Sequence, residues 1–429
     1  MKNKFKIVNL TKTEYPVKKK IKLGVCIFLT FFILVTTNKL VNSPIIPNFL
    51  SIFIFPLFFY MVYHVWKFYL LSERKRKNSI ENLLKYYIKT NNLYTTDRTG
   101  FITNFAIFSF LQDDESITVR AYKQGDNFSD RLNTLDTSLS ALLNLPLENK
   151  LDNISYCDYI FNKNKDNRIV IADDKLIYNY STNIPLSNNL NWNIAKQPHL
   201  LLAGVTGGGK TTFINYLIIE MMKMKADVYI CDPKRSDLAS LKNILGSDYV
   251  ASDVNNIAKL TRVVKEIMEN RFIEYKENAS NLVYGHSFVD YHLTPVFLIM
   301  DELGAFRAGA DKKVFNETMS NLSEIILKGR EMGVFCVLST QQPNSQNIPT
   351  ELRDNLSVRL ALGKMSSEAY RMIFGEDIKG LQSISSVGSG YIYLDGLGWC
   401  KPKFYEAPFL DYKNYNFIQN LSKYQESRI

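Results

Sequence analysis

Cysteine and histidine are scarce in this chain of 429 residues, and their scarcity limits the chemistry that can be expected. The five cysteines lie far apart, and none belongs to a Cys-x-x-Cys pair or to a Cys and His spacing typical of zinc ligands. A disulfide framework and a structural zinc site are therefore not expected. Only four histidines occur, which also argues against histidine-based catalysis. The cysteines, expected as reduced thiols, are Cys26, Cys157, Cys231, Cys336 and Cys400.

A net excess of basic charge is also missing from most of the chain, although the formal net charge is +10. The first 77 residues hold twelve lysines and two arginines against two acids, a net charge of +12, which leaves −2 for residues 78–429. The basic excess therefore says nothing about nucleic-acid binding by those residues. Any surface there that binds phosphates must be local.

Two apolar segments make up much of the first 77 residues. Residues 23–38 contain no charge, and neither do residues 40–66. A spanning helix needs roughly 20 apolar residues, with about 17 as the lower limit. Both segments are near the short end, but their tandem arrangement predicts a transmembrane helical hairpin at about 21–38 and 49–66. A cleavable signal peptide and two buried helices of a large soluble core are the alternatives.

Lysines and arginines lie at the two outer ends of this hairpin, before its first segment and after its second. Residues 18–20 and Lys22 precede the first segment, residues 74–77 follow the second, and the link between the segments carries only Lys39. Such flanks stay in the cytoplasm. We therefore expect a multi-pass protein of the cell membrane with both termini cytoplasmic, and contact between residues 74–77 and anionic lipid.

The chain as a whole divides into a membrane part and two predicted domains. Residues 1–77 form the tail and the hairpin, residues 78–190 a small α+β middle domain, and residues 191–429 an α/β domain with a mostly parallel sheet flanked by helices. In the middle domain, residues 116–122 alternate as a strand does and residues 130–143 have helical spacing. This domain shows no catalytic group of residues.

A glycine-rich loop begins at residue 204. The sequence GVTGGGKT at 204–211 matches G-x-x-x-x-G-K-[ST], with an apolar run before it and a helix-like stretch after it, which is the context that this pattern requires. Its backbone N–H groups and the helix N-terminus would bind the phosphates of ATP. Lys210 should reach the β- and γ-phosphates, and the Thr211 hydroxyl should bind Mg²⁺. The expected nucleotide contacts are Gly204, Thr206, Gly207, Gly208, Gly209, Lys210, Thr211 and Thr212.

Two later apolar runs end in polar residues. Residues 296–300 are wholly apolar, as in a buried parallel strand, and are followed by Asp301 and Glu302. The carboxyl ends of such strands form the mouth of an open α/β sheet, where ligands bind. Asp301 suits Mg²⁺ coordination through water, and Glu302 suits a general base for the attacking water. Residues 333–340 precede Gln341, which could orient that water or sense the γ-phosphate; a simple turn is the alternative.

These segments together resemble the motor domain of the FtsK/SpoIIIE-type DNA translocases, in the additional-strand, RecA-like class of P-loop ATPases. Their order and spacing agree over residues 198–375. The matching segments are PHLLLAGVTGGGKTT at 198–212, CDPKRSDL at 231–238, IMENRF at 267–272, FLIMDELGAF at 297–306, ILKGREMGVFCVLSTQQP at 326–343 and LRDNLSVRLALGKMSSEAYRMIFG at 352–375. The resemblance implies a RecA-like core at 191–429 that hydrolyses ATP with Mg²⁺.

The chain is more similar to one subgroup. It has two predicted spans and no long linker, and about fifty residues follow the last motif, too few for a DNA-reading winged-helix domain. The stretch GKMSSEAYRMIFG at 363–375 and the middle domain resemble the TcpA- and ConQ-like coupling proteins of Gram-positive conjugative elements. This resemblance implies a membrane-anchored ATPase that passes relaxosome-bound DNA to a transfer channel, with the relaxase and channel proteins as partners.

Relatives act as ring hexamers with ATP between subunits, so the resemblance also implies a homo-hexamer. A neighbouring subunit would supply an arginine that stabilises transition-state charge. Arg330 is the first candidate, followed by Arg353 and Arg359. DNA would pass through the ring, held by its phosphates without regard to sequence. The loop cations that could line this pore, or could equally form a solvated surface, are Lys234, Arg235, Arg307, Lys312 and Lys313.

Three other functions remain open from the sequence. A translocase of the same class could serve chromosome or plasmid segregation. A type VII protein-secretion ATPase would carry several tandem motor domains, and this chain has one. A nucleotide-bound membrane scaffold would need no turnover, and the presence of both Glu302 and Gln341 argues against it.

Overall fold

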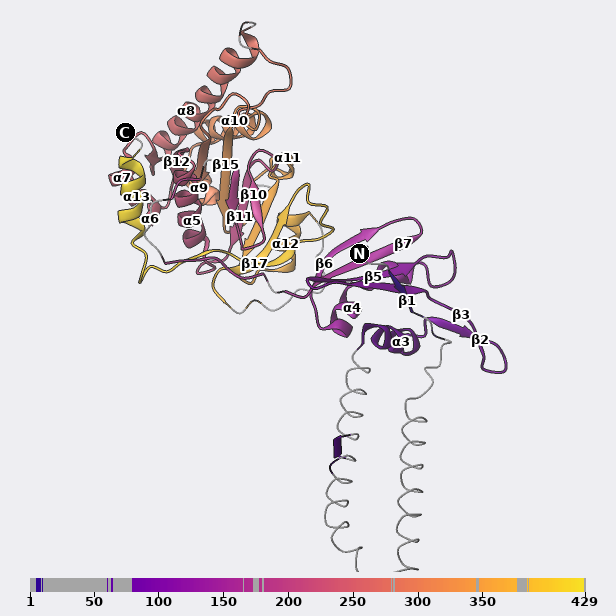
Figure 1. Ribbon diagram of the computed structural model, residues 1–429. Coiled ribbons are helices and arrows are strands. Elements are labelled where there is room, and N and C mark those ends of the chain that lie inside the picture. The colour runs from indigo at the N-terminus through magenta and orange to yellow at the C-terminus, as the bar shows by residue number, and fades with distance from the viewer. Residues whose placement is uncertain are drawn as a thin grey trace, which may run out of the picture. The chain divides into compact units, whose positions relative to one another are not determined.

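The protein forms two compact units, residues 1–164 and 165–429 (Figure 1). The segments predicted to span a membrane, 21–38 and 49–66, lie outside the described residues except for Tyr60, Tyr63 and His64. Within the described part of the chain, no helix is both long enough and apolar enough to cross a membrane. The computed structural model describes residues 5–8, 10, 60, 63–64, 79–164, 166–172, 177–179, 181–278, 280, 282–344, 347–375, 384 and 386–427.

The first unit packs an antiparallel sheet, in the order β1-β4-β5-β7-β6, against helices α3 and α4. Strand β5 shows how the sequence produces this packing. Its side chains alternate between the two faces of the sheet, so that Ile117, Val119 and Ala121 all lie in the core. This is an α+β arrangement. The elements are β1 (Lys6–Ile7), α3 (Ile80–Thr90), β2 (Tyr94–Thr96), β3 (Ile102–Phe105), β4 (Phe108–Gln112), β5 (Ser116–Tyr122), η1 (Arg131–Asn133), α4 (Asp136–Leu143), β6 (Leu147–Asp152) and β7 (Tyr156–Asn162).

The second unit is built on an eight-stranded sheet in the order β13-β12-β14-β15-β11-β16-β17-β18. The first six strands are parallel, and β17 and β18 are antiparallel. Strand β15 lies between β11 and β14 and pairs with both. The strands are β11 (Leu200–Gly204), β12 (Asp227–Cys231), β13 (Val250–Ala251), β14 (Val296–Met300), β15 (Val334–Thr340), β16 (Val358–Leu362), β17 (Ser389–Leu394) and β18 (Lys403–Glu406).

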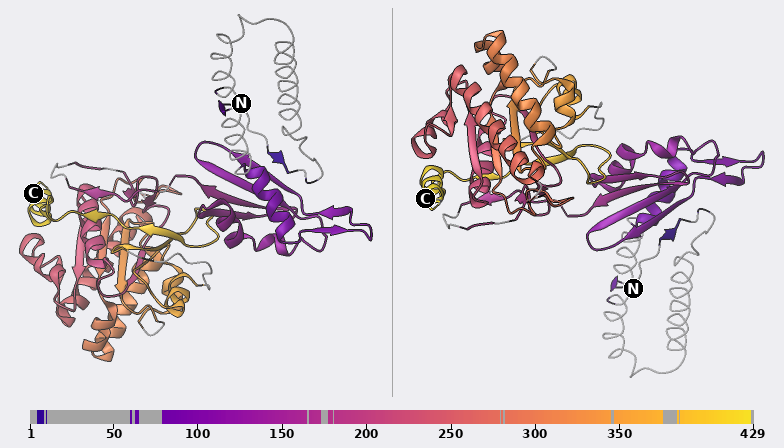
Figure 2. Two further views of the ribbon diagram at one scale, coloured as in Figure 1. Left: turned by 90° about the horizontal axis from the view of Figure 1, so that it is seen from below. Right: turned by 90° about the horizontal axis from the view of Figure 1, so that it is seen from above.

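Helices cover both faces of this sheet, as the sequence predicts. Helices α5 and α13 belong to one core, and α8 and α10 to the other, where they also pack on each other (Figure 2). Strands β11, β14 and β15 are therefore buried on both sides, which explains their unbroken apolar sequences. The helices are α5 (Lys210–Lys223), α6 (Asp237–Ser240), α7 (Lys242–Leu245), α8 (Val254–Phe272), η2 (Ile273–Glu277), α9 (Leu303–Gly309), α10 (Lys312–Lys328), α11 (Thr350–Asp354), α12 (Ser367–Phe374) and α13 (Phe417–Glu426).

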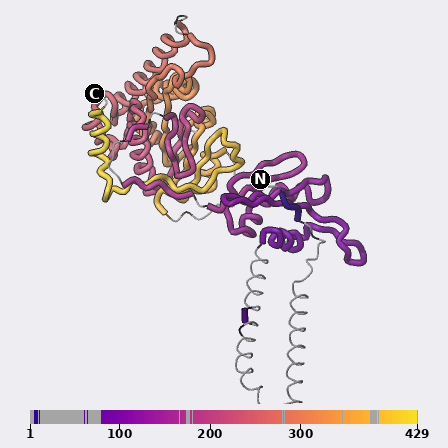
Figure 3. Tube along the Cα trace, viewed as in Figure 1, coloured from indigo at the N-terminus to yellow at the C-terminus, as the bar shows by residue number. Residues whose placement is uncertain are grey.

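The segment after residue 165 belongs to the second unit. Strand β8 (Val170–Ile171) pairs with β19 (Phe409–Leu410), so this segment runs beside the C-terminal part of the chain (Figure 3). The hairpin of β9 (Asn183–Pro185) and β10 (Asn191–Asn193) buries Ile184 and Trp192 in the same core as α5. This unit thus includes residues that precede 191, the start expected for the α/β domain.

Candidate active site

The loop of residues 205–209 joins β11 to α5 at the carboxyl edge of the sheet. Gly207 and Gly209 have φ angles of +76° and +98°, a left-handed conformation that favours glycine. A Cβ on Gly204 would lie 2.7 Å from the Leu362 carbonyl oxygen, so a side chain there would push the loop off β16. Exposed backbone N–H groups at the N-terminus of a helix, here 14 residues long, are suited to binding phosphate.

Residues 387–388 contact this loop, and Arg168 supports them. The Gly388 N–H donates to the Gly208 carbonyl at 3.0 Å. Arg168 in turn donates to the carbonyl of Val387 at 3.1 Å and to that of Ala407. The Arg168 guanidinium fills the space that a Cβ on Gly388 would need. Burial lowers the pKa of Arg168.

Lys210 begins α5 and folds back across the loop. Its Nζ donates to the Gly204 carbonyl at 2.5 Å. Burial lowers the pKa of Lys210, and the charges of Glu302 and Asp301 oppose this effect. Both carboxylates therefore lie close enough to act on the lysine. Of the other predicted nucleotide contacts, Thr206, Gly207 and Thr211 are exposed, Gly209 and Thr212 are half-buried, and Gly204 and Gly208 are buried.

Asp301 follows the last residue of β14 at the same edge. Its backbone N–H donates to the Cys231 carbonyl at 2.9 Å, which extends the pairing with β12. Burial raises the pKa of Asp301, and the nearby carboxylates of Asp232 and Glu302 raise it further. A group of this kind fits a magnesium ion, which takes hard oxygen ligands and restores the charged carboxylate.

Glu302 is buried and sits in an unusual backbone conformation. Its φ and ψ are +46° and +68°, left-handed for a residue that carries a side chain. Such conformations cost about 1–3 kcal/mol and cluster at functional sites. Its Oε1 accepts from the Gln341 N–H at 3.1 Å, and its Oε2 accepts from the Lys234 ammonium at 3.0 Å. The structure therefore brings Gln341 to Glu302 through the backbone of Gln341.

Lys234 stands on a loop that Asp232 organises. The fully buried Asp232 carboxylate accepts from the N–H groups of Lys234, Ser236 and Ala239 and from the Ser236 hydroxyl. The sequence left Lys234 open as a pore cation or as part of a solvated surface, whereas the structure places its ammonium 3.0 Å from Glu302 Oε2. The sequence shows a mostly apolar run at 228–231 followed by Asp232 and Lys234, which places both residues near this edge of the sheet but does not identify the partner of Lys234.

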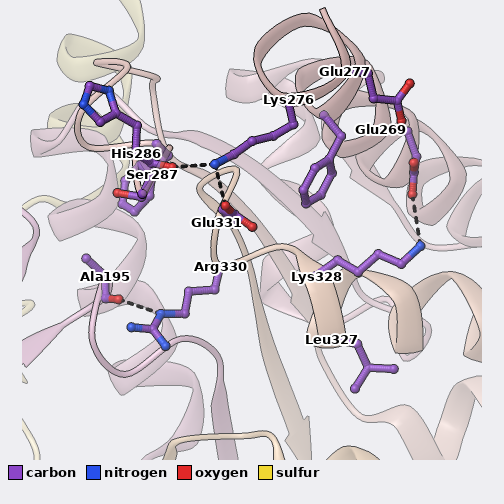
Figure 4. Close-up of a pocket in the computed structure, with 13 residues that line it drawn as sticks. Ala195, Glu269, Lys276, Glu277, His286, Ser287, Leu327, Lys328, Arg330 and Glu331 are labelled. Carbon is purple, nitrogen blue, oxygen red and sulfur yellow. Dashed lines mark hydrogen bonds and ion pairs between the residues drawn. The ribbon is translucent and has the colours of Figure 1, made fainter. Parts of the chain in front are cut away.

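Arg330 lies at the opposite edge of the sheet from this site. It occupies the turn between α10 and β15, ahead of the first residue of β15, whereas Asp301 and the loop follow the last residues of their strands. Its Nε donates to the Ala195 carbonyl at 3.0 Å, and its side chain lines a pocket with Lys276 and Glu331 (Figure 4). Within its own chain, Arg330 cannot reach the nucleotide loop.

The other two candidate arginines bond to their own local segments. Arg353 in α11 donates to the Thr350 hydroxyl at 3.2 Å, and Arg359 in β16 donates to the Leu356 carbonyl at 3.1 Å. Among the described residues, no cluster of three or more His, Cys, Asp or Glu could hold a metal alone. Magnesium at Thr211 and Asp301 would complete its ligands with water and substrate phosphate.

The comparisons with known proteins place the chain in a family. The model of the FtsK/SpoIIIE family matches residues 167–363. The FtsK domain-containing protein YdcQ of Bacillus subtilis is 32% identical over 340 residues, which cover 78% of this chain and 69% of YdcQ. The DNA translocase FtsK of Corynebacterium glutamicum is 24% identical over 257 residues, covering 55% of this chain and 27% of that protein.

Solved structures are more distant. The conjugation coupling protein TcpA of pCW3, in its monomer form with ATPγS, is 18% identical, with a TM-score of 0.49 and coverage of 75% of this chain and 93% of that one. The genome packaging NTPase B204 of Sulfolobus turreted icosahedral virus 2, with AMPPCP, is 18% identical, with a TM-score of 0.31 and coverage of 50% and 99%. From the match with YdcQ and the family model, the chain belongs to the FtsK/SpoIIIE family and is a P-loop ATPase.

Proposed function

We propose that the protein is a membrane-anchored, ATP-driven DNA translocase that acts as a conjugation coupling protein. The observation that carries the proposal is the assembly, at one edge of one sheet, of the glycine loop, Lys210, Asp301 and Glu302. Family membership makes DNA the substrate to test first. The predicted hairpin at 21–38 and 49–66 would anchor the chain in the cell membrane.

The geometry suggests how hydrolysis would proceed. The phosphates of ATP would lie on the loop of residues 205–209, where the Lys210 ammonium can exchange the Gly204 carbonyl for phosphate oxygens. Magnesium held by Thr211 and Asp301 would neutralise phosphate charge. Glu302 would take a proton from the water that attacks the γ-phosphorus, with ADP as the leaving group, and Gln341 would help to orient that water.

The conjugative role is supported by the sequence resemblance of residues 363–375 and of the middle domain, residues 78–190, to coupling proteins. In that role the motor would form a homo-hexamer, hold DNA by its phosphates, and work with a relaxase and a transfer channel. A segregation translocase would share the whole active site, so only a cellular assay separates the two. In donor cells, Glu302→Gln should abolish transfer of the conjugative element and leave chromosome segregation unchanged.

The biochemical test is ATPase activity of the full chain in lipid nanodiscs, with single- or double-stranded DNA, over a series of salt concentrations. DNA should stimulate hydrolysis, and the stimulation should fade as salt rises, because phosphate contacts release counterions. Lys210→Ala serves as the inactive control. Hydrolysis that ignores both forms of DNA at every salt concentration would contradict the translocase proposal and favour protein secretion.

A further inference from the structure

The ion pair between Lys234 and Glu302 links an exposed side chain to a buried one. The side chain of Glu302 is 9% exposed, whereas that of Lys234 is 42% exposed. A buried carboxylate is costly unless it is paired and hydrogen-bonded. Among the bonds found to the Glu302 side chain in the described chain, the one from Lys234 is the only one that brings a positive charge.

The loop that carries Lys234 is stiff at its base. The Lys234 N–H donates to Asp232 Oδ1 at 3.1 Å. Asp232 Oδ2 accepts from the Ser236 and Ala239 N–H groups at 2.7 and 3.0 Å. The next residue, Arg235, has a φ of +54°. The lysine thus starts from a fixed backbone position, which is what a residue that orients another side chain requires.

Glu302 needs anchors because its own backbone is strained. Its two carboxylate oxygens are bonded from opposite sides, Oε2 by Lys234 after β12 and Oε1 by Gln341 after β15. These strands are the two neighbours of β14, which leads into Glu302. Without Lys234, the carboxylate would keep one bond and could rotate about it.

We infer that Lys234 is a positioning residue that orients the Glu302 carboxylate toward the attacking water. The inference rests on the proposed role of Glu302 as the general base. It assigns to Lys234 a task in ATP hydrolysis that is independent of DNA, in place of the pore contact or solvated surface that the sequence left open.

The test compares Lys234→Met and Lys234→Gln with Lys234→Arg in the full chain without DNA. The first two variants should lower kcat roughly 10- to 100-fold, as expected when a reacting group is misplaced by about 1 Å. Binding of a fluorescent ATP analogue should stay within about twofold of the unchanged protein, and the melting temperature should confirm folding. Lys234→Arg should recover most of kcat because it keeps the charge. The exposed Lys242 in α7 provides the matched control, Lys242→Met.

A double variant shows whether Lys234 acts through Glu302. Adding Lys234→Met to Glu302→Gln should cause no further loss in single-turnover hydrolysis, because the oriented group is already gone. Additive losses, an unchanged or raised kcat in Lys234→Met, or a loss of nucleotide affinity that matches the loss of kcat would each overturn the inference. Full hydrolysis by Glu302→Gln would instead overturn the proposed general base, which separates the two failures.

Discussion

In the candidate site, the charged forms of Lys210 and Asp301 are disfavoured by burial. Burial lowers the pKa of Lys210 and raises that of Asp301, so both shifts favour the neutral forms. Phosphate would stabilise the charged lysine, and a divalent cation would stabilise the charged aspartate. Nucleotide and magnesium should therefore bind cooperatively at this edge of the sheet.

Replacing Lys210 by Ala should remove the cation that lies across the loop. We expect hydrolysis to fall by at least roughly 10²–10³-fold, the loss typical when one electrostatic donor is removed. Steady-state ATPase rates measure this, and titration with a fluorescent nucleotide shows how much of the loss is binding. Lys242→Ala is the control, and full activity of Lys210→Ala would disprove the site.

A second residue-scale prediction concerns His199, which burial affects strongly. Its side chain is fully buried, and burial lowers its pKa from 6.5 to about 3. Because Nδ1 accepts the Cys336 N–H at 3.0 Å, the folded state requires the neutral ring. The unfolded chain takes up a proton below pH 6.5 and the folded chain does not, so stability is full above 6.5 and is lost as pH falls. The loss is about 1.4 kcal/mol per pH unit down to a pH near the folded pKa.

Urea unfolding at pH 7 and pH 5.5, followed by fluorescence of the buried Trp192, measures this loss. His199→Asn is the comparison, because asparagine tolerates the left-handed φ of +61° and offers an acceptor that does not titrate. The variant should be less stable than the unchanged protein at pH 7 but should lose less stability on acidification. Equal pH dependence in the two proteins would contradict the assignment to His199.

At the scale of elements, the sequence predicts what is local. Strands β5, β14 and β15 follow from alternation or from unbroken apolar runs, and the glycine loop follows from its pattern between a strand and a helix. The contacts of Lys234 and Arg168 do not follow, because they join residues 68 and 219 positions apart. The left-handed conformation of Glu302 also has no local signal, since glutamate rarely adopts it.

The support of the glycine loop can be tested at Arg168. Arg168→Met leaves the carbonyls of Val387 and Ala407 without this donor, which should cost about 1–3 kcal/mol of stability and weaken ATP binding. Thermal unfolding and nucleotide titration measure both effects. Arg262→Met is the matched control, because Arg262 makes an exposed ion pair with Glu317, worth about 0–1 kcal/mol. Unchanged nucleotide affinity in Arg168→Met would show that the loop does not depend on this support.

At the scale of the whole molecule, the position of Arg330 decides whether its proposed role in hydrolysis needs a second copy of the chain. The site at the carboxyl edge holds Lys210, Lys234, two acids and Gln341. Arg330, however, lies at the other edge of the same sheet. A role for Arg330 in hydrolysis therefore requires a second copy of the chain. Such a role would make the homo-hexamer, or at least a contact between copies, part of the active site.

Mixing two inactive variants tests this requirement. Arg330→Ala subunits keep Glu302, and Glu302→Gln subunits keep Arg330, so a contact between the two kinds can hold one complete site. Each variant alone should be nearly inactive, and an equimolar mixture assembled together should recover part of the activity, up to about a quarter of the unchanged protein if subunits mix at random. Replacing Glu302→Gln by the double variant Glu302→Gln/Arg330→Ala removes every complete site and should abolish the recovery. Activity of the mixture that never exceeds the mean of the two variants would show that Arg330 does not act between subunits.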